Sequence, residues 1–173
     1  MTGMAAGREE PNGAGTGFLL PRSCGRGFIR RCSGMAPKAR GISESALYVE
    51  DVPHSAEFYG GLLGSPVIHR DESFCALRVA PGQVLLLFRR GASKDATDMG
   101  FGTIIGHDGS GPLHVCFGIG AGEAAAWEGR LAELGVPLES RVDWPSGAIS
   151  LYFRDPDGHA VELATPGLWP DEA

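Results

Sequence analysis

One pattern, a strand followed by a helix and three further strands, occurs twice in this chain of 173 residues. Apolar spacing and turn residues predict the first copy as a strand at 45–49, a helix at 52–63 and strands at 66–69, 74–79 and 83–89. The second copy begins about 70 positions later and is predicted as a strand at 113–119, a helix at 123–134 and strands at 138–143, 148–154 and 159–164. A repeat of this length and order predicts two βαβββ modules that face each other, and it argues against a solenoid.

The residues between the predicted elements support this arrangement. Asp51 is a good helix N-cap, and Pro53 is tolerated in the first turn of the helix that follows. Gly64 and Gly135 follow the two predicted helices and are typical helix stops. The segment 155–158, Asp-Pro-Asp-Gly, predicts a tight turn before the final strand.

These patterns divide the chain into parts. We predict a disordered N-terminal extension at 1–41, one domain at 42–167 and a C-terminal tail at 168–173. Within the domain we place module one at 42–90, a glycine-rich connection at 91–112 and module two at 113–165. A connection of that length is either a linker or a functional loop that covers a site.

Charge separates the N-terminal extension from the rest of the chain. Residues 1–41 carry seven basic and two acidic side chains, whereas residues 42–173 carry eight basic and nineteen acidic ones. The acidic domain is a poor match for nucleic acid, which is bound through Lys and Arg. No apolar run approaches the roughly 20 residues of a membrane-spanning helix, so we expect neither nucleic acid nor membrane as a partner.

The N-terminal extension has three open interpretations. Translation beginning at Met35 would make residues 1–34 an extension that is not part of the protein. An Arg-rich segment can also direct a protein to an organelle, although Glu9 and Glu10 argue against this. A flexible arm is the third interpretation, and with no apolar stretch of signal-peptide length we expect a cytoplasmic protein.

The four cysteines do not predict a metal site or a disulfide framework. Cys24 and Cys32 are too far apart for a zinc knuckle and have no histidine nearby. Cys75 and Cys116 lie in apolar, strand-like runs, and we predict both to be buried thiols. A reducing compartment fits this pattern.

Two modules with these motifs resemble the vicinal oxygen chelate superfamily, which includes glyoxalase I, bleomycin- and fosfomycin-resistance proteins and extradiol dioxygenases. The resemblance covers residues 42 to about 165, and it is carried by ALYVEDV at 46–52, by the helix ending in LLG at 62–64 and by YFRDPDGHAVEL at 152–163. It implies an α+β fold in which two tandem modules form a cup-shaped, partly open eight-stranded barrel. It also implies a small-molecule substrate and a homodimer.

The resemblance further implies a divalent metal ion bound by residues of the first and last strands of the modules. By position these residues are Glu44, His114 and Glu162, whereas Leu86 stands where glyoxalase I has a fourth ligand. Three-ligand members typically have His at the position of Glu44. Two carboxylates neutralise a divalent ion, so the site would be a milder Lewis acid that favours Mn²⁺, Mg²⁺ or Fe²⁺, although Zn²⁺ and Ni²⁺ also remain open.

Two of the three proposed ligands, Glu44 and His114, also have a simpler explanation. Glu44 at a strand start is ordinarily a solvated edge residue, and His114 in an apolar strand is as readily a core histidine with a hydrogen-bond partner. Glu162 lies between Val161 and Leu163 and must face the opposite side from both, where an ionised carboxylate needs a partner. We predict that all three are ligands and that Glu162 also takes part in catalysis.

Other residues are candidates for the walls of the pocket. Tyr48 and Phe88 are predicted to line module one, and Tyr152 and Trp144 to supply a hydrogen-bond donor or a stacking surface, with core packing as the alternative for the last two. His107, followed by Asp108 in the connection, is a candidate general acid or base, with a turn-forming pair as the alternative.

Two functions therefore compete, with a scaffold that lacks chemistry as a third possibility. The ligand set favours a metal-dependent enzyme that acts on a small substrate with adjacent oxygen atoms, as a lyase, isomerase, transferase or dioxygenase. Ring cleavage is the least favoured of these reactions because Glu44 stands where His is typical. The alternative is a metal-free protein of the bleomycin-resistance type that sequesters a small molecule.

Overall fold

The structure is a computed structural model, and it describes residues 37–170. The predicted N-terminal extension, including Cys24 and Cys32, falls outside the described residues as far as residue 36. Residues 37–43 have no regular secondary structure and are exposed. Residues 171–173 of the predicted tail also lie outside the described part of the chain.

Module one is a four-stranded sheet with one helix. Its elements are β1 (Glu44–Val49), α1 (Val52–Leu63), β2 (Val67–Arg70), β3 (Phe74–Ala80) and β4 (Gln83–Arg89). The strand order is β1-β4-β3-β2, with β1 parallel to β4 and the other pairs antiparallel. The parallel pair is possible because α1, β2 and β3 return the chain to the start of β4.

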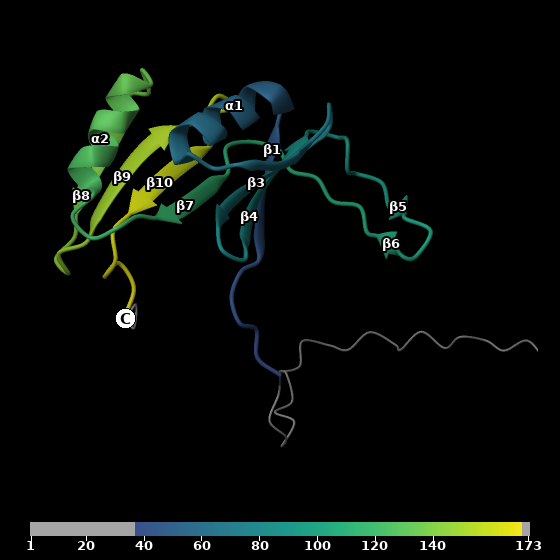
Figure 1. The fold of residues 1–173 in the computed structure, drawn as a ribbon, viewed down its shortest axis with the longest axis horizontal. Helices are drawn as coiled ribbons and strands as arrows, with labels where there is room; N and C mark the ends of the chain where they lie inside the picture. The colour runs from purple at the N-terminus through teal and green to yellow at the C-terminus, as the bar shows by residue number, and fades with distance from the viewer. Residues whose placement is uncertain (1–36, 171–173) are drawn as a thin grey trace, which may run out of the picture. The chain divides into compact units, whose positions relative to one another are not determined.

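Module two repeats this topology (Figure 1). Its elements are β7 (His114–Gly118), α2 (Ala124–Glu133), β8 (Leu138–Asp143), β9 (Ile149–Arg154) and β10 (Ala160–Ala164). The order is β7-β10-β9-β8, with β7 parallel to β10. The predicted pair of βαβββ modules is confirmed, and the two sheets do not close into one barrel, as expected of a partly open cup.

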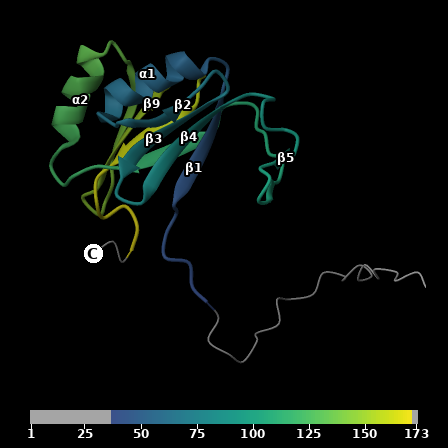
Figure 2. The same cartoon turned by 45° about the vertical axis from the view of Figure 1, so that its right-hand side comes forward.

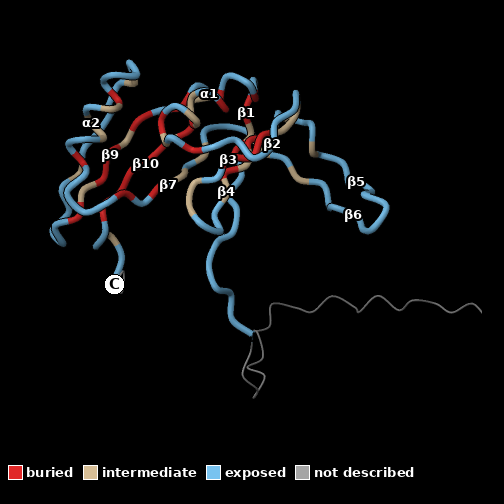
Figure 3. The backbone as a smooth tube through the Cα atoms, viewed as in Figure 1, coloured by how far each residue is buried: buried red, intermediate tan, exposed pale blue. Residues whose placement is uncertain are grey.

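Alternation along the strands separates a packed face from an open face. On β1, Leu47 and Val49 are buried, whereas Glu44 and Ala46 are exposed and Tyr48 is half-buried. One continuous core runs through both modules and includes residues of α1 and α2 (Figure 3). The helices therefore cover the packed side of the sheets, and the opposite side remains available for a site.

The predicted helix signals of α1 are present. The Asp51 carboxylate accepts a hydrogen bond from the backbone N–H of His54 at 2.9 Å, which caps the first turn. Gly64 ends the helix with a left-handed φ of 62°, a conformation that a side chain would strain. These local signals explain why the sequence predicted this helix to within a residue.

The connection at 91–112 contains an element that the sequence did not predict. It forms a short hairpin of β5 (Thr97–Asp98) and β6 (Thr103–Ile104), which projects from module one (Figures 1 and 2). Strands of two residues are too short to show an alternating pattern. We call residues 91–112 the arm.

The prediction that Cys116 is buried is wrong. Cys75 on β3 is buried, but Cys116 on β7 is exposed. Phe117, the next residue on β7, is the one that enters the core. Because alternate residues of a strand face opposite sides, Cys116 lies with His114 on the open face.

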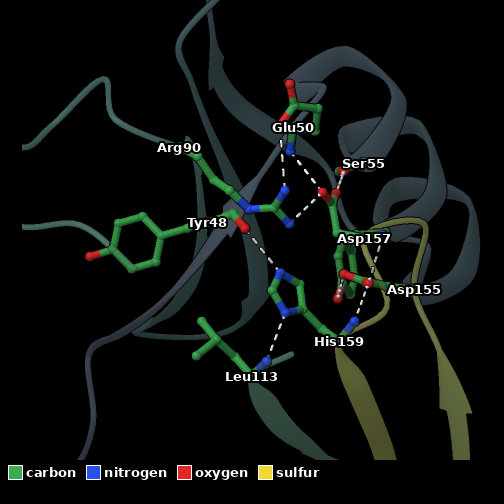
Figure 4. Close-up of polar contacts among 9 residues, drawn as sticks. Tyr48, Glu50, Ser55, Arg90, Leu113, Asp155, Asp157 and His159 are labelled. Carbon is green, nitrogen blue, oxygen red and sulfur yellow. Dashed lines mark hydrogen bonds and ion pairs between the residues drawn. The ribbon is translucent and has the colours of Figure 1, made fainter. Parts of the chain in front are cut away.

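The turn before β10 links the two modules (Figure 4). We call residues 155–159 the latch. Asp155 accepts hydrogen bonds from the backbone N–H groups of Asp157 and His159, which hold the turn, and from the Tyr59 hydroxyl of α1 at 2.8 Å. Module two is thereby attached to the helix of module one.

Asp157 and His159 extend the attachment to β1 and β7. Asp157 accepts from the Glu50 backbone N–H, the Ser55 hydroxyl and the Arg90 guanidinium, at 2.8, 3.1 and 2.9 Å. The fully buried ring of His159 accepts from the Leu113 N–H at Nδ1 and donates to the Tyr48 carbonyl through Nε2. These two bonds require a neutral ring protonated at Nε2.

No helix among residues 37–170 is long and apolar enough to cross a bilayer.

The latch predicts a specific loss of stability. Tyr59→Phe keeps the buried ring but removes the donor to Asp155, which leaves a buried carboxylate oxygen without its partner. We expect the free energy of unfolding in urea to fall by about 1–3 kcal/mol. Tyr48→Phe removes a hydroxyl from a half-buried ring and is the matched control, with an expected loss of at most about 1 kcal/mol. Equal losses in the two variants would contradict a linking role for Asp155.

Candidate functional site

Two of the three predicted metal ligands lie together on module two. β7 and β10 are parallel neighbours, and both His114 and Glu162 face the open side of this sheet. His114 Nε2 lies 3.3 Å from Glu162 Oε2. The His114 side chain is 54% exposed and Glu162 only 6%, so the pair offers an accessible imidazole beside a buried carboxylate.

Glu162 has an unused hydrogen-bonding atom. Its Oε1 is buried and has no hydrogen-bond partner among the described residues. A buried carboxylate oxygen without a partner is costly, because it has lost its hydration and gained nothing in return. This oxygen is therefore the local feature that best fits the binding of a cation.

Tyr152 lies beside the same pair. Its ring stacks at 6.5 Å on the His114 ring. Burial raises the pKa of Tyr152, and the neighbouring Glu162 carboxylate raises it further. The phenol therefore stays protonated and can donate a hydrogen bond at neutral pH.

Glu44, the third predicted ligand, lies on the open face of module one. It makes no hydrogen bond or ion pair among the described residues. Within residues 37–170 of one chain, no group of three His, Cys, Asp or Glu side chains is placed to bind one ion. The structure thus brings together His114 and Glu162, while the role of Glu44 stays a prediction.

His107 belongs to a second cluster, on module one. The Tyr48 hydroxyl and His107 Nδ1 are 2.8 Å apart, and the His107 ring meets the Phe88 ring edge-on at 4.7 Å. Asp108 accepts hydrogen bonds from the backbone N–H groups of Gly91 and Gly109, so it has the turn-forming role. Its nearby charge and burial both raise the pKa of Tyr48, with burial the larger cause.

A glycine allows this cluster to form. The arm passes so close to β1 at Gly109 that a Cβ there would collide with the Tyr48 ring. This close approach brings His107 onto the open face of module one.

The remaining predicted pocket residues are only partly enclosed. The Trp144 indole N–H donates to the Ser150 hydroxyl at 2.9 Å, and its side chain stays exposed. Tyr152 is half-buried on the same module. Neither residue belongs to the core, which leaves both free to contact a ligand.

A cavity of about 540 Å³ separates the open face of module one from the arm. Its wall includes the predicted residues Glu44, Phe88 and His107. It also includes Asp71 and Asp95, which the sequence analysis missed because neither belongs to a recognisable motif. We call this the arm cavity.

The donor set fits a divalent ion in part. An imidazole and a carboxylate on adjacent strands, with one carboxylate oxygen orphaned, are suitable ligands for Mn²⁺, Fe²⁺ or Zn²⁺. His114 and Glu162 would hold the ion, and at least one further ligand is required.

The sequence model of the Glyoxalase/Bleomycin resistance protein/Dioxygenase superfamily matches residues 41–163. The chain belongs to this superfamily. The match covers both modules, so the resemblance inferred from the motifs is confirmed.

Solved superfamily structures agree. A lactoylglutathione lyase from Agrobacterium tumefaciens is 30% identical, covers 78% of this chain and 99% of its own, and has a TM-score of 0.71. The fosfomycin-resistance protein FosX from Listeria monocytogenes shares the fold with a TM-score of 0.56 at 20% identity, over 76% of this chain and 97% of its own. Metallothiol transferase FosB of Bacillus licheniformis is 39% identical over 57 residues, which are 32% of this chain and 37% of FosB. This chain therefore spans only about a third of the length of that curated relative.

The tyrosines predict how the protein responds to alkaline pH. Burial raises the pKa of all three, which are Tyr48, Tyr59 and Tyr152, above the ordinary 10.0. We expect absorbance titration of the folded protein to show no tyrosine half-ionised at pH 10. The folded chain holds these protons more tightly than the unfolded chain. The contribution of the three phenols to the free energy of unfolding is therefore fully present below pH 10 and is lost as the pH rises further.

The contribution of Glu162 to the raised pKa of Tyr152 can be measured separately. Glu162→Gln removes a negative charge beside Tyr152 and should lower the pKa of that phenol toward 10.0. Tyr152→Phe is made in the wild type and in Glu162→Gln, and each protein is titrated by absorbance. In each background, the signal lost with Tyr152→Phe is the ionisation of Tyr152. An unchanged or higher pKa for Tyr152 would contradict the contact.

Proposed function

We propose that this protein is a divalent-metal-dependent enzyme that acts on a small substrate with adjacent oxygen atoms. The observation that supports this most is the His114–Glu162 pair, whose buried Oε1 lacks a partner on the open face of a superfamily fold. The names of the relatives, a lactoylglutathione lyase and a metallothiol transferase, support an enzymatic role. A divalent ion, when bound, supplies Lewis-acid polarisation of the substrate oxygens.

The residues around the pair have distinct proposed roles. Glu162 and His114 bind the ion and fix its position. Tyr152, kept protonated by its raised pKa, donates a hydrogen bond to a substrate oxygen. His107 acts as the general acid or base at Nε2, because its Nδ1 is already bonded to the Tyr48 hydroxyl.

The ligand charges favour one type of reaction. Glu44, as the third ligand, would add a second carboxylate and neutralise the charge of a divalent ion. Such a centre suits proton transfer or group addition better than oxidative ring cleavage. We therefore favour a lyase, isomerase or transferase reaction over a dioxygenase reaction.

We also propose a homodimer in which Glu44 of one copy completes the pair of the other. Support comes from the placement of the three ligands, since within the described residues of one chain only His114 and Glu162 come together. A twofold dimer brings the same two faces together twice and so forms two equal sites.

A reducing compartment, the cytoplasm, suits this protein. Cys75, which lies in the described part of the chain, is a buried free thiol. The Arg-rich N-terminus keeps an organelle as the alternative.

Metal binding tests the proposal directly. We expect protein purified without chelator to contain a divalent ion by elemental analysis. His114→Ala and Glu162→Ala should each weaken metal affinity by more than about 100-fold in calorimetric titration, since even residues that only orient a ligand are worth 10- to 100-fold. His54→Ala, an exposed histidine on α1, is the control and should change nothing.

Other outcomes would decide between the alternatives. Absence of metal, with stability unaffected by EDTA, would overturn the enzyme proposal and favour a sequestering protein that uses the arm cavity. Intact affinity in Glu44→Ala would remove Glu44 from the ligand set.

Mixed dimers test the shared site. In a dimer of one Glu44→Ala chain and one His114→Ala chain, a shared arrangement leaves one site with all its ligands. After random exchange, about a quarter of all sites should therefore regain tight metal binding, although each variant alone has none. No recovery in a mixture shown to exchange subunits would place the site within one chain.

A further inference from the structure

The arm cavity has a chemical character that indicates its ligand. It lies between β3 and β4 on one side and the arm on the other, and its volume of about 540 Å³ is typical of small-molecule sites. Glu44 forms part of its wall, so the cavity adjoins the residue proposed above as third metal ligand.

One wall of the cavity is aromatic. Phe74 on β3 and Phe88 on β4 are cross-strand neighbours, with ring centroids 4.8 Å apart. His107 contacts the edge of this pair from the arm. Aromatic faces of this kind bind rings by stacking and bind cations through the electrons of the ring.

The charges of the wall all have one sign. Its ionisable lining residues include three carboxylates, Glu44, Asp71 and Asp95, and no Lys or Arg. Hydrogen bonds from the Ser73 backbone and hydroxyl lower the pKa of Asp71 to about 2, so this carboxylate is charged at neutral pH. Asp95 has no hydrogen bond or ion pair among the described residues and is available to a ligand.

The arm contributes an apolar wall that is open to water. Met99, Ile104 and Ile105 line the cavity, yet they are 45%, 53% and 79% exposed. A ligand with an apolar part would cover these side chains and gain free energy by removing them from water. An anion would instead be repelled by the three carboxylates, because no Lys or Arg in the cavity wall offsets their charge.

We propose that the arm cavity binds an organic cation, a small molecule with an ammonium group and an aromatic or aliphatic ring. The ring lies on Phe74 and Phe88 under the arm, and the ammonium group faces Asp95 and Asp71. The substrate of the proposed enzyme is then an amine-bearing compound. This inference rests on the proposed function in one respect, which is that Glu44 belongs to the metal centre beside the cavity.

Three probes with the same phenyl ring and two-carbon chain test the charge preference. Phenethylamine, 2-phenylethanol and 3-phenylpropanoate differ mainly in the charge at the end of the same ring and chain. We expect titration of the full chain, by calorimetry or ligand-observed NMR, to give the order amine, alcohol, carboxylate, with at least a ~10-fold difference between the first and the last. Added salt should reduce this difference.

Variants locate the binding. Asp95→Asn should reduce the ratio of amine to alcohol affinity by about three- to fivefold. Glu57→Gln removes the same charge from the exposed surface of α1 and should leave the ratio unchanged. Ile105→Ser, on the exposed arm, should weaken all three probes to a similar degree without unfolding the protein. Phe101→Ala, at an arm residue outside the cavity lining, is its control.

The organic-cation inference and the metal-enzyme proposal can fail independently of each other. Equal binding of amine and carboxylate, or an amine preference that Asp95→Asn leaves undiminished, would overturn the organic-cation inference whatever the metal content. A clear amine preference in a protein that binds no divalent ion would support the cavity and overturn the metal enzyme. Asp95→Asn should also keep the metal affinity of the wild type, because Asp95 is not among the proposed ligands.

Discussion

The hydrogen bonds of the latch are the constraint on which the rest of the structure depends. The two sheets share no strand pairing, so backbone ladders alone do not fix one module against the other. Asp155 and Asp157 supply this connection through side-chain and backbone donors of module one, and the buried His159 ring joins β1 to the start of β7. The same turn leads directly into β10, which carries Glu162. The position of the proposed metal ligand is therefore set by the contact between modules.

Local signals explain why so much of the fold was predictable. Asp51, Gly64 and alternating apolar residues act within a few positions, and they located the helices and main strands of both modules to within about two residues. Cys116 shows the limit of such reasoning, because its apolar neighbours say nothing about which face of β7 meets the core. The segment 91–112 was predicted as a connection, but its hairpin was missed because strands of two residues show no alternation. The position of the arm was also not predictable, since it depends on contacts between distant residues, such as the approach of Gly109 to Tyr48.

The sequence predicted the His114–Glu162 pair of the candidate site but not the surroundings of Glu44, and the difference has a physical reason. His114 and Glu162 lie on adjacent strands of one module, so strand alternation and superfamily position together indicated that they meet. Glu44 was assigned by the same positional reasoning, but its neighbours depend on how the modules and copies assemble, which no local pattern encodes. The acidic and aromatic lining of the arm cavity likewise combines β3, β4 and the arm. It became recognisable only when these segments were placed together.

Electrostatics connects the two proposed sites. Carboxylates gather on the open faces, with Glu162 in one module and Glu44, Asp71 and Asp95 in the other. Such a distribution is unfavourable in the free protein, because like charges repel and the buried Glu162 has an oxygen without a partner. A divalent ion at the pair and an organic cation in the arm cavity would each relieve part of this cost. Ligands of opposite charge to the protein then stabilise the fold as they bind, since each one binds the native state and not the unfolded chain. The acidic character of residues 42–173 is in this sense a property of the site as well as of the surface.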